Sequence, residues 1–99
     1  MRYAVVIARS ALEQFRKLDG RWQSRLKRAM REHLETAPMQ ESKSRIKRLS
    51  VLRQPQYRLR VVEMRVFYDV NKDEKRVEVL GFVEKPGTFQ WLGEHGEPG

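Results

Sequence analysis

Cysteine is absent from the 99-residue sequence, and histidine occurs only twice. Without cysteine the chain has neither disulfide bonds nor thiolate metal ligands. The histidines, His33 and His95, lie far apart and the carboxylates are scattered, so we expect no bound metal and no cofactor. A glycine-rich phosphate loop and the motif of a nucleophilic triad are also missing. The sequence therefore does not favour a metalloenzyme, a P-loop protein or a triad hydrolase.

Long apolar runs are missing as well. The apolar stretch near the N-terminus lies between Arg2 and Arg9. It is too short for the apolar core of a signal peptide and far too short to span a bilayer. We therefore expect a cytoplasmic protein with no membrane partner. The length predicts a single domain over residues 1–99.

Positive charge, in contrast, is abundant. The chain has 21 Lys and Arg against 13 Asp and Glu, which gives a formal net charge of +8 at pH 7. Such a balance favours polyanionic partners, namely RNA, DNA or an acidic protein. A hydrophobic fraction of 39% is typical of a folded domain. The composition therefore predicts a globular, anion-binding protein.

The first part of the chain predicts a strand and two helices. Residues 3–7 are rich in β-forming side chains and predict a short strand. Ser10 and Glu13 form a capping-box pattern, so a helix is expected from Ser10 to about residue 18, ended by Asp19 and the following glycine. A second helix is expected to run up to Pro38. Its apolar stripe comprises Trp22, Leu26, Ala29, Met30, His33 and Leu34. His33 is therefore interpreted as a packed structural histidine.

The second part predicts strands. A short strand is expected over 45–49, followed by a hairpin over 57–70 that turns around Glu63 and Met64, and a last strand over 76–83. Pro86 opens a short helix. Residues 93–99 are expected to form a loose tail containing a solvated His95. The order β-α-α-β-β-β-β with a short C-terminal helix predicts an α+β fold, with two helices packed on one face of a largely antiparallel sheet.

The hairpin over 57–70 has an unusual polar face. Side chains alternate between the two faces of a strand, so Arg58, Arg60 and Arg65 can all project from the same face. Three guanidinium groups on one rigid surface repel one another unless an anion lies nearby. The partner is either an acidic neighbour within the fold or a phosphate outside it.

The hairpin resembles a known protein family. Tyr57-Arg58-Leu59-Arg60-Val61, followed by Arg65-Val66-Phe67-Tyr68-Asp69-Val70, is similar to the toxins of the RelE/ParE superfamily from bacterial type II toxin–antitoxin systems. Arg45-Ile46-Lys47-Arg48-Leu49 before the hairpin and Val79-Leu80-Gly81-Phe82-Val83-Glu84-Lys85 after it, with a trailing Trp91, extend the resemblance over nearly the whole chain. The resemblance implies a RelE-like fold.

The resemblance also implies site residues. RelE-like members cleave messenger RNA on the ribosome without a metal, and the matching catalytic positions are Arg58, Arg60, Arg65 and Lys85. The expected RNA-binding residues are Lys47, Arg48, Arg53, Phe89 and Trp91. Two positions depart from the family pattern: Lys85 replaces an arginine, and Phe89 or Trp91 stands where a tyrosine is usual. Lysine lacks the bidentate fork of arginine, and tryptophan cannot exchange a proton as a phenol does.

Proton transfer in such a site is hard to assign from the residues. Arginines hold their protons too tightly to act as a general base. Lys47 or Lys85, with a pKa lowered by neighbouring positive charges, is a candidate base or acid. The basic run around Arg25 and Arg28 on the second helix is interpreted as a solvated face, with RNA contact as the alternative.

Three functions stay open from the sequence. The first is a ribosome-dependent, metal-independent mRNA endoribonuclease that inhibits translation, with the ribosome and mRNA as partners. The second is a ParE-like inhibitor of DNA gyrase without nuclease activity, which the departures at Lys85 and Trp91 favour. The third is a non-toxic module that binds operator DNA together with its antitoxin. All three imply an acidic, partly disordered antitoxin that folds across the basic hairpin.

Overall fold

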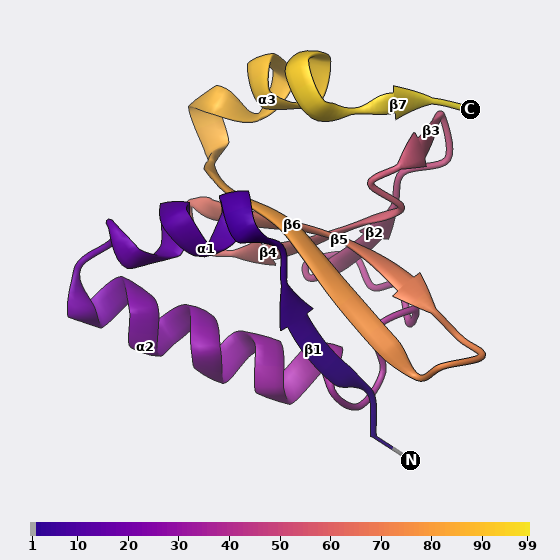
Figure 1. Ribbon diagram of the computed structural model, residues 1–99, viewed down its shortest axis with the longest axis horizontal. Coiled ribbons are helices and arrows are strands. Elements are labelled where there is room, and N and C mark those ends of the chain that lie inside the picture. Colours follow the sequence, from indigo (N-terminus) through magenta and orange to yellow (C-terminus); the bar gives the residue numbers. More distant parts are fainter. Residues whose placement is uncertain (1) are drawn as a thin grey trace.

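The computed structural model describes residues 2–99 (Figure 1). Its helical elements are α1 (Arg9–Arg16), α2 (Gly20–Ala29), the π-helical turn η1 (Met30–Leu34), the 3-10 turn η2 (Lys85–Gly87) and α3 (Thr88–His95). Its strands are β1 (Ala4–Ile7), β2 (Ile46–Arg48), β3 (Leu52–Gln54), β4 (Tyr57–Val61), β5 (Met64–Asn71), β6 (Arg76–Glu84) and β7 (Glu97–Pro98).

Five strands form the central sheet in the order β1-β6-β5-β4-β2. The edge strand β1 pairs with β6 in parallel, and the other neighbours pair antiparallel. The predicted α+β class and the predicted order of the five main strands along the chain are confirmed. The ribbon formed by β3 and β7 adds a second, two-stranded sheet that was not predicted.

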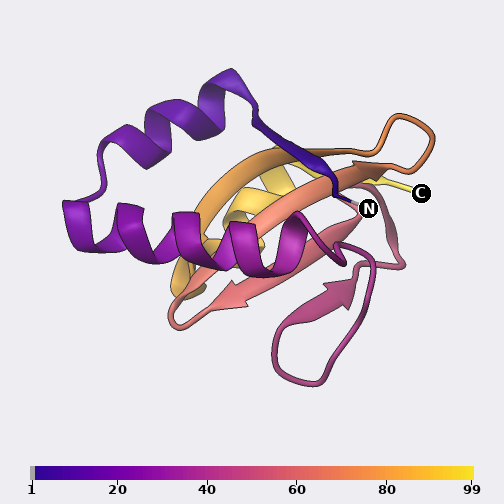
Figure 2. The same ribbon diagram turned by 90° about the horizontal axis from the view of Figure 1, so that it is seen from below.

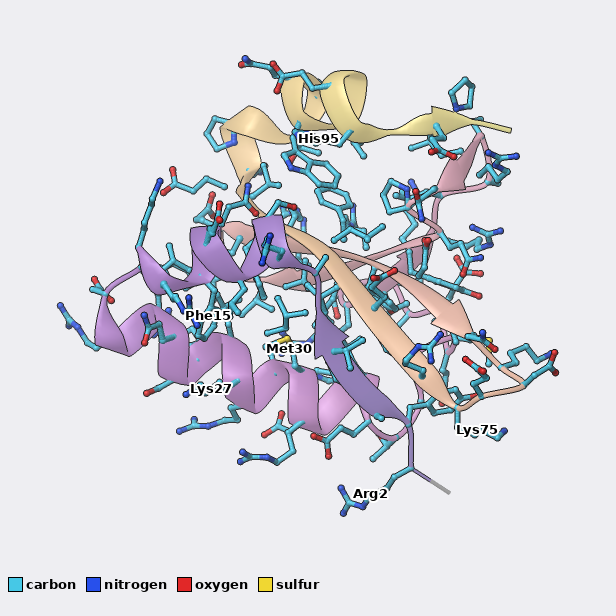
Figure 3. The ribbon with its side chains drawn as sticks, viewed as in Figure 1. Arg2, Phe15, Lys27, Met30, Lys75 and His95 are labelled. Atoms are coloured by element: carbon cyan, nitrogen blue, oxygen red, sulfur yellow. The ribbon has the colours of Figure 1, made fainter. Side chains whose placement is uncertain are left out.

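The sheet has helices on both faces, as Figures 1 and 2 show from two directions. The α1–α2 hairpin packs on one face, and α3 lies across the other. The main core fills the space beneath α1 and α2, where Leu26, Leu34 and Leu59 are completely buried. Phe15 of α1 meets Phe82 of β6 with 5.3 Å between the ring centroids, and Figure 3 shows Phe15 among the side chains of this layer. Each such side chain contributes about 1.5–3 kcal/mol of burial free energy.

The apolar stripe of the second helix packs as predicted except at His33, whose side chain lies outside the core and is half-buried beside Glu32. The ends of the helices differ from the prediction. The capping box was wrong: α1 begins at Arg9, its N-cap is Ala8, and no side chain caps it. The backbone N–H of Ala8 donates to Val79 O (2.9 Å), so the chain enters the helix directly from the sheet. Asp19 acts as the N-cap of α2, where its carboxylate accepts from the backbone N–H of Trp22 (2.9 Å).

The β4–β5 hairpin turns one residue earlier than predicted. Tyr57 pairs with Tyr68 and Val61 pairs with Met64, which leaves Val62 and Glu63 as a two-residue loop. Val62 adopts a left-handed backbone with φ of 56°. This conformation is unfavourable for a β-branched residue and costs on the order of 1–3 kcal/mol. The surrounding contacts must therefore hold the turn in place.

The prediction of a loose tail over 93–99 was wrong. Helix α3 continues to His95, and β7 then pairs with β3. The guanidinium of Arg53 binds the Glu97 carboxylate at 2.9 Å. The chain near its C-terminus is thus tied to a segment more than forty positions earlier. A two-residue strand has no periodic pattern of its own, so the sequence could not indicate it.

Candidate functional site

Strand register gathers basic side chains on the sheet face away from α1 and α2. Arg60 pairs directly with Arg65 across β4 and β5, and Arg58 pairs with Phe67 on one side and Lys47 on the other. Directly paired residues project to the same face of a sheet. Arg58, Arg60, Arg65 and Lys47 therefore form one surface, which we call the basic face. The predicted clustering of the three arginines is what this register produces.

The positive charges of the basic face are not neutralised within the fold. No ion pair among residues 2–99 involves Arg58, Arg60 or Arg65. Burial lowers the pKa of Arg58, and the charges of Arg65 and Arg60 lower it further. The pKa of Arg65 is lowered by burial first and then by Arg60, while Glu63 acts in the opposite direction. The three guanidinium groups thus repel one another, and a bound anion would relieve that repulsion.

One carboxylate lies on the same face of β5 but is already engaged. The two oxygens of Asp69 accept hydrogen bonds from the Gln54 side chain (2.6 Å) and from the backbone N–H of Gln56 (2.8 Å). The Gln56 side chain in turn accepts from the backbone N–H of Val70 (2.9 Å). Asp69 therefore holds the loop before β4 against β5 and is not an ion-pair partner of the arginines.

The three arginines differ in accessibility. Arg65 is only 5% exposed, and its Nη1 donates to the backbone carbonyls of Val62 (2.9 Å) and Met64 (3.1 Å). These bonds hold the left-handed turn. Arg58 is half-buried, and its Nε has no hydrogen-bond partner within the described residues. Arg60 is exposed. Arg60 can therefore meet a ligand directly, Arg58 is partly covered with its Nε buried, and Arg65 supports the hairpin.

Helix α3 covers the part of this face that lies over β5 and β6. The indole of Trp91 stacks on Phe67 with centroids 4.9 Å apart and an interplanar angle of 9°. Gly81 leaves the space beneath it, since a Cβ at this position would lie 2.7 Å from Cε2 of Trp91. His95 stacks on the indole at 4.8 Å, on the side of α3 that faces the sheet (Figure 3). The expectation that His95 lies in a tail was therefore wrong, whereas its predicted exposure to solvent is confirmed.

The other residues predicted for the site do not all lie on the basic face. The backbone N–H of Lys85 donates to Glu63 O (2.7 Å), which brings Lys85 beside the β4–β5 turn. Arg48 lies on the opposite face, with its guanidinium 5.2 Å from the Tyr57 ring. Arg53 is paired with Glu97 as described above. On α3, Trp91 is buried and Phe89 is 91% exposed.

Two features of this site had no signal in the sequence. His95 joins the aromatic stack only because α3 extends further than its apolar pattern indicates. Asp69 looks like an ordinary polar residue of an alternating strand, and its role as a loop anchor depends on Gln54 and Gln56 from another segment. Among residues 2–99, no group of three His, Cys, Asp or Glu could hold a metal ion. Within the same range, no helix has the length and apolarity needed to cross a membrane.

Comparisons with known proteins identify the class. The chain and its fold are those of a RelE/ParE superfamily toxin of a type II toxin–antitoxin system. Residues 5–84 match the family described as the ParE toxin of type II toxin-antitoxin system, parDE, and the chain belongs to this family. No curated protein sequence matches the chain significantly.

Solved structures share the fold. The archaeal RelE–RelB complex from Pyrococcus horikoshii OT3 matches with a TM-score of 0.70 and 26% identity, over 86% of this chain and 97% of that chain. The toxin–antitoxin complex RelBE2 from Mycobacterium tuberculosis has a TM-score of 0.70 and 19% identity, over 85% and 99%. The RelB–RelE complex from Methanococcus jannaschii has a TM-score of 0.65 and 17% identity, over 88% and 98%.

Proposed function

We propose that this toxin binds RNA at the basic face and cleaves mRNA on the ribosome, without a metal ion. The observation that carries the proposal is a pair of neighbouring guanidinium groups, the exposed Arg60 and the half-buried Arg58, that form no ion pair within residues 2–99. Arginine matches the geometry of a phosphate and can bind it through two hydrogen bonds. The repulsion between these groups makes an anion the ligand that stabilises the surface most.

Cleavage of RNA without a metal uses the ribose 2′-hydroxyl as an internal nucleophile. The protein must align the attack and stabilise the negative charge that grows on the phosphate. Arg58 and Arg60 would supply that stabilisation, and Arg65 would hold the hairpin that positions them. Removing one such donor typically costs about 100- to 1000-fold in rate. Lys47 and Lys85, which flank the arginines, are the candidates for proton transfer.

An antitoxin is the expected partner. A toxin with an uncompensated basic face needs a neutralising partner in its own cell, and an acidic segment that folds across the face would meet that need. The similar solved structures include RelE toxins in complex with RelB antitoxins, which supports this partner. We therefore expect a neighbouring gene for a small acidic protein.

The test is to incubate the purified protein with ribosomes carrying a defined mRNA and to map the cut sites. Arg58→Ala and Arg60→Ala should each lower the cleavage rate by about 100-fold or more. Arg16→Ala, which removes an exposed arginine from the end of α1, is the matched control and should cleave normally. Intact mRNA with the wild-type protein would overturn the proposal.

Gyrase inhibition is the second candidate function. Two observations favour it: residues 5–84 match the ParE toxin family, and Arg65 is buried and already bonded to backbone carbonyls. A trapping assay with purified gyrase and plasmid DNA separates the two functions. Gyrase-linked double-strand breaks together with intact mRNA would favour inhibition of gyrase over cleavage of RNA.

A further inference from the structure

A row of arginines occupies the exposed side of α2, on the sheet face opposite to α3. Arg21, Arg25 and Arg28 follow one another at intervals of four and three residues, so they lie on one side of the helix. At a rise of 1.5 Å per residue, they are spaced about 6 Å and about 4.5 Å along its axis. The guanidinium of Arg25 lies 5.2 Å from the centroid of the Trp22 ring, which restricts its position.

The row borders two shallow hollows that share Arg25 and Arg28 in their walls. The first runs along α2 past Arg21, Arg25 and Arg28. The second lies between α2 and the β4–β5 turn and includes Arg25, Arg28 and Arg45. Because Arg25 and Arg28 line both hollows, the path continues from the start of α2 to the edge of the sheet. We call Arg21, Arg25, Arg28 and Arg45 the α2 band.

The α2 band reaches the basic face at the sheet edge. The backbone N–H of Arg60 donates to Arg45 O (2.8 Å), so the two residues are neighbours at this edge. Arg60 belongs to the basic face, and Arg45 borders the hollow beside α2. One extended polyanion could therefore contact both surfaces by passing over the edge strand β2.

The α2 band is positively charged and has few anions of its own. None of its four arginines forms an ion pair within residues 2–99. The nearby carboxylate of Asp19 accepts from the backbone N–H of Trp22, and that of Glu32 lies 3.9 Å from Nε2 of His33. Asp19 lines the first hollow and Glu32 lines the second, so four arginines face two carboxylates and the band keeps a net positive charge that an external anion can neutralise.

The apolar side chains beside the band are small. Its second hollow contains Ala29, Val61, Val62 and the imidazole of His33, and the Trp22 ring beside the row has Arg25 over it. Protein interfaces usually depend on a central aromatic or large aliphatic anchor. A surface of arginines without such an anchor suits a phosphate backbone, where charge supplies most of the affinity.

We propose that the α2 band is a second nucleic-acid surface, which binds the phosphate backbone of double-stranded RNA. The choice of RNA rests on the proposed function, because the band continues into the face proposed to bind mRNA. Structured RNA carries closely spaced phosphates in a rigid array, which matches arginines fixed along a helix. The band would thus hold a folded RNA while the basic face holds the strand that is cut.

The test measures binding of the full chain to a short RNA duplex over a series of salt concentrations. Arg25→Gln/Arg28→Gln removes two charges from the band, and Arg9→Gln/Lys72→Gln removes two exposed charges elsewhere. If each lost phosphate contact changes the slope of log K against log salt by about 0.9, the band variant should lose up to about 1.8. The control should keep the wild-type slope. Arg25→Lys/Arg28→Lys, which retains both positive charges, should have a slope close to that of the wild type.

Several outcomes would overturn the proposal. Equal loss in the band variant and the control would mean that only net charge matters. An unchanged slope in the band variant would remove the band from RNA binding altogether. A loss seen with a DNA duplex but not with RNA would contradict the assignment to RNA. A loss seen only with a polyglutamate peptide would make the band a protein-binding surface.

This experiment is independent of cleavage. If the wild-type protein leaves mRNA intact but the salt dependence of duplex binding is weaker in the band variant, the proposed cleavage is refuted and the second surface is supported. If the wild-type protein cleaves mRNA but the band variant binds the duplex as the wild type does, the proposed cleavage is supported and the second surface is refuted. Circular dichroism and thermal unfolding check that each variant retains the fold.

Discussion

Gly81 offers a sharp test of how α3 is held over the basic face. No glycine of the described residues has a positive φ, so Gly81 is not needed for its backbone conformation. It is needed for space, because a Cβ there would meet the indole of Trp91. We expect Gly81→Ala to destabilise the protein by about 1–3 kcal/mol through overpacking.

The sign of the effect should reverse when the indole is removed. In a Trp91→Ala background the space above residue 81 is free, and alanine is better than glycine within a strand by about 0.5–1 kcal/mol. Gly81→Ala should then stabilise the protein by about that amount. The coupling free energy between the two sites is therefore expected to be about 1.5–4 kcal/mol.

The assay is urea unfolding followed by far-UV circular dichroism for the wild type, both single variants and the double variant. Gly93→Ala on α3 is the control, since a Cβ there meets no atom within 4 Å. It should stabilise the helix by about 1 kcal/mol in either background. If Trp91→Ala is too unstable to measure, Trp91→Leu removes the indole and keeps an apolar contact with Phe67. An equal cost of Gly81→Ala in both backgrounds would refute the packing of α3 through Trp91.

Three further predictions follow from single contacts. Tyr68→Phe removes a buried hydrogen bond of 2.7 Å to Pro38 O and should cost about 1–3 kcal/mol in unfolding free energy. Burial raises the pKa of Tyr68 above its ordinary value of 10.0. The neutral phenol should therefore contribute fully to the unfolding free energy below pH 10, and this contribution should decline as the pH rises further. Wild-type stability should fall more steeply than that of Tyr68→Phe in urea titrations above pH 10. Arg65→Ala should lower the unfolding free energy, measured in urea, by about 1.5–3 kcal/mol for each charge-assisted bond to the turn. A loss of toxicity in this variant would therefore not by itself identify Arg65 as a catalytic residue. Glu97→Gln breaks an exposed ion pair with Arg53 and should leave the urea midpoint of unfolding nearly unchanged; a clear fall in the midpoint would mean that β7 supports the whole fold.

The structural differences among the arginines change how site variants should be interpreted. Arg60 is exposed, so its replacement removes a ligand-binding group and little else. Arg65 supports the left-handed turn at Val62, so its replacement also affects the hairpin. A comparison of toxicity with stability for both variants separates these two contributions. The sequence pattern does not distinguish Arg60 from Arg65, because alternation along a strand predicts the face on which a side chain lies but not how deeply it is buried.

The class of fold and the face on which the arginines of the hairpin lie could both be predicted from local sequence patterns. Alternation along a strand and the i, i+4 stripe of a helix are local properties, so Arg58, Arg60 and the core residue Leu26 could be placed without a structure. The tertiary structure alone decided which of these arginines remains accessible, what covers the rest of the face and how the chain is tied down beyond residue 93. Those features depend on Trp91 over Gly81 and on β7 beside β3, and such contacts between distant segments leave no periodic signal in the sequence.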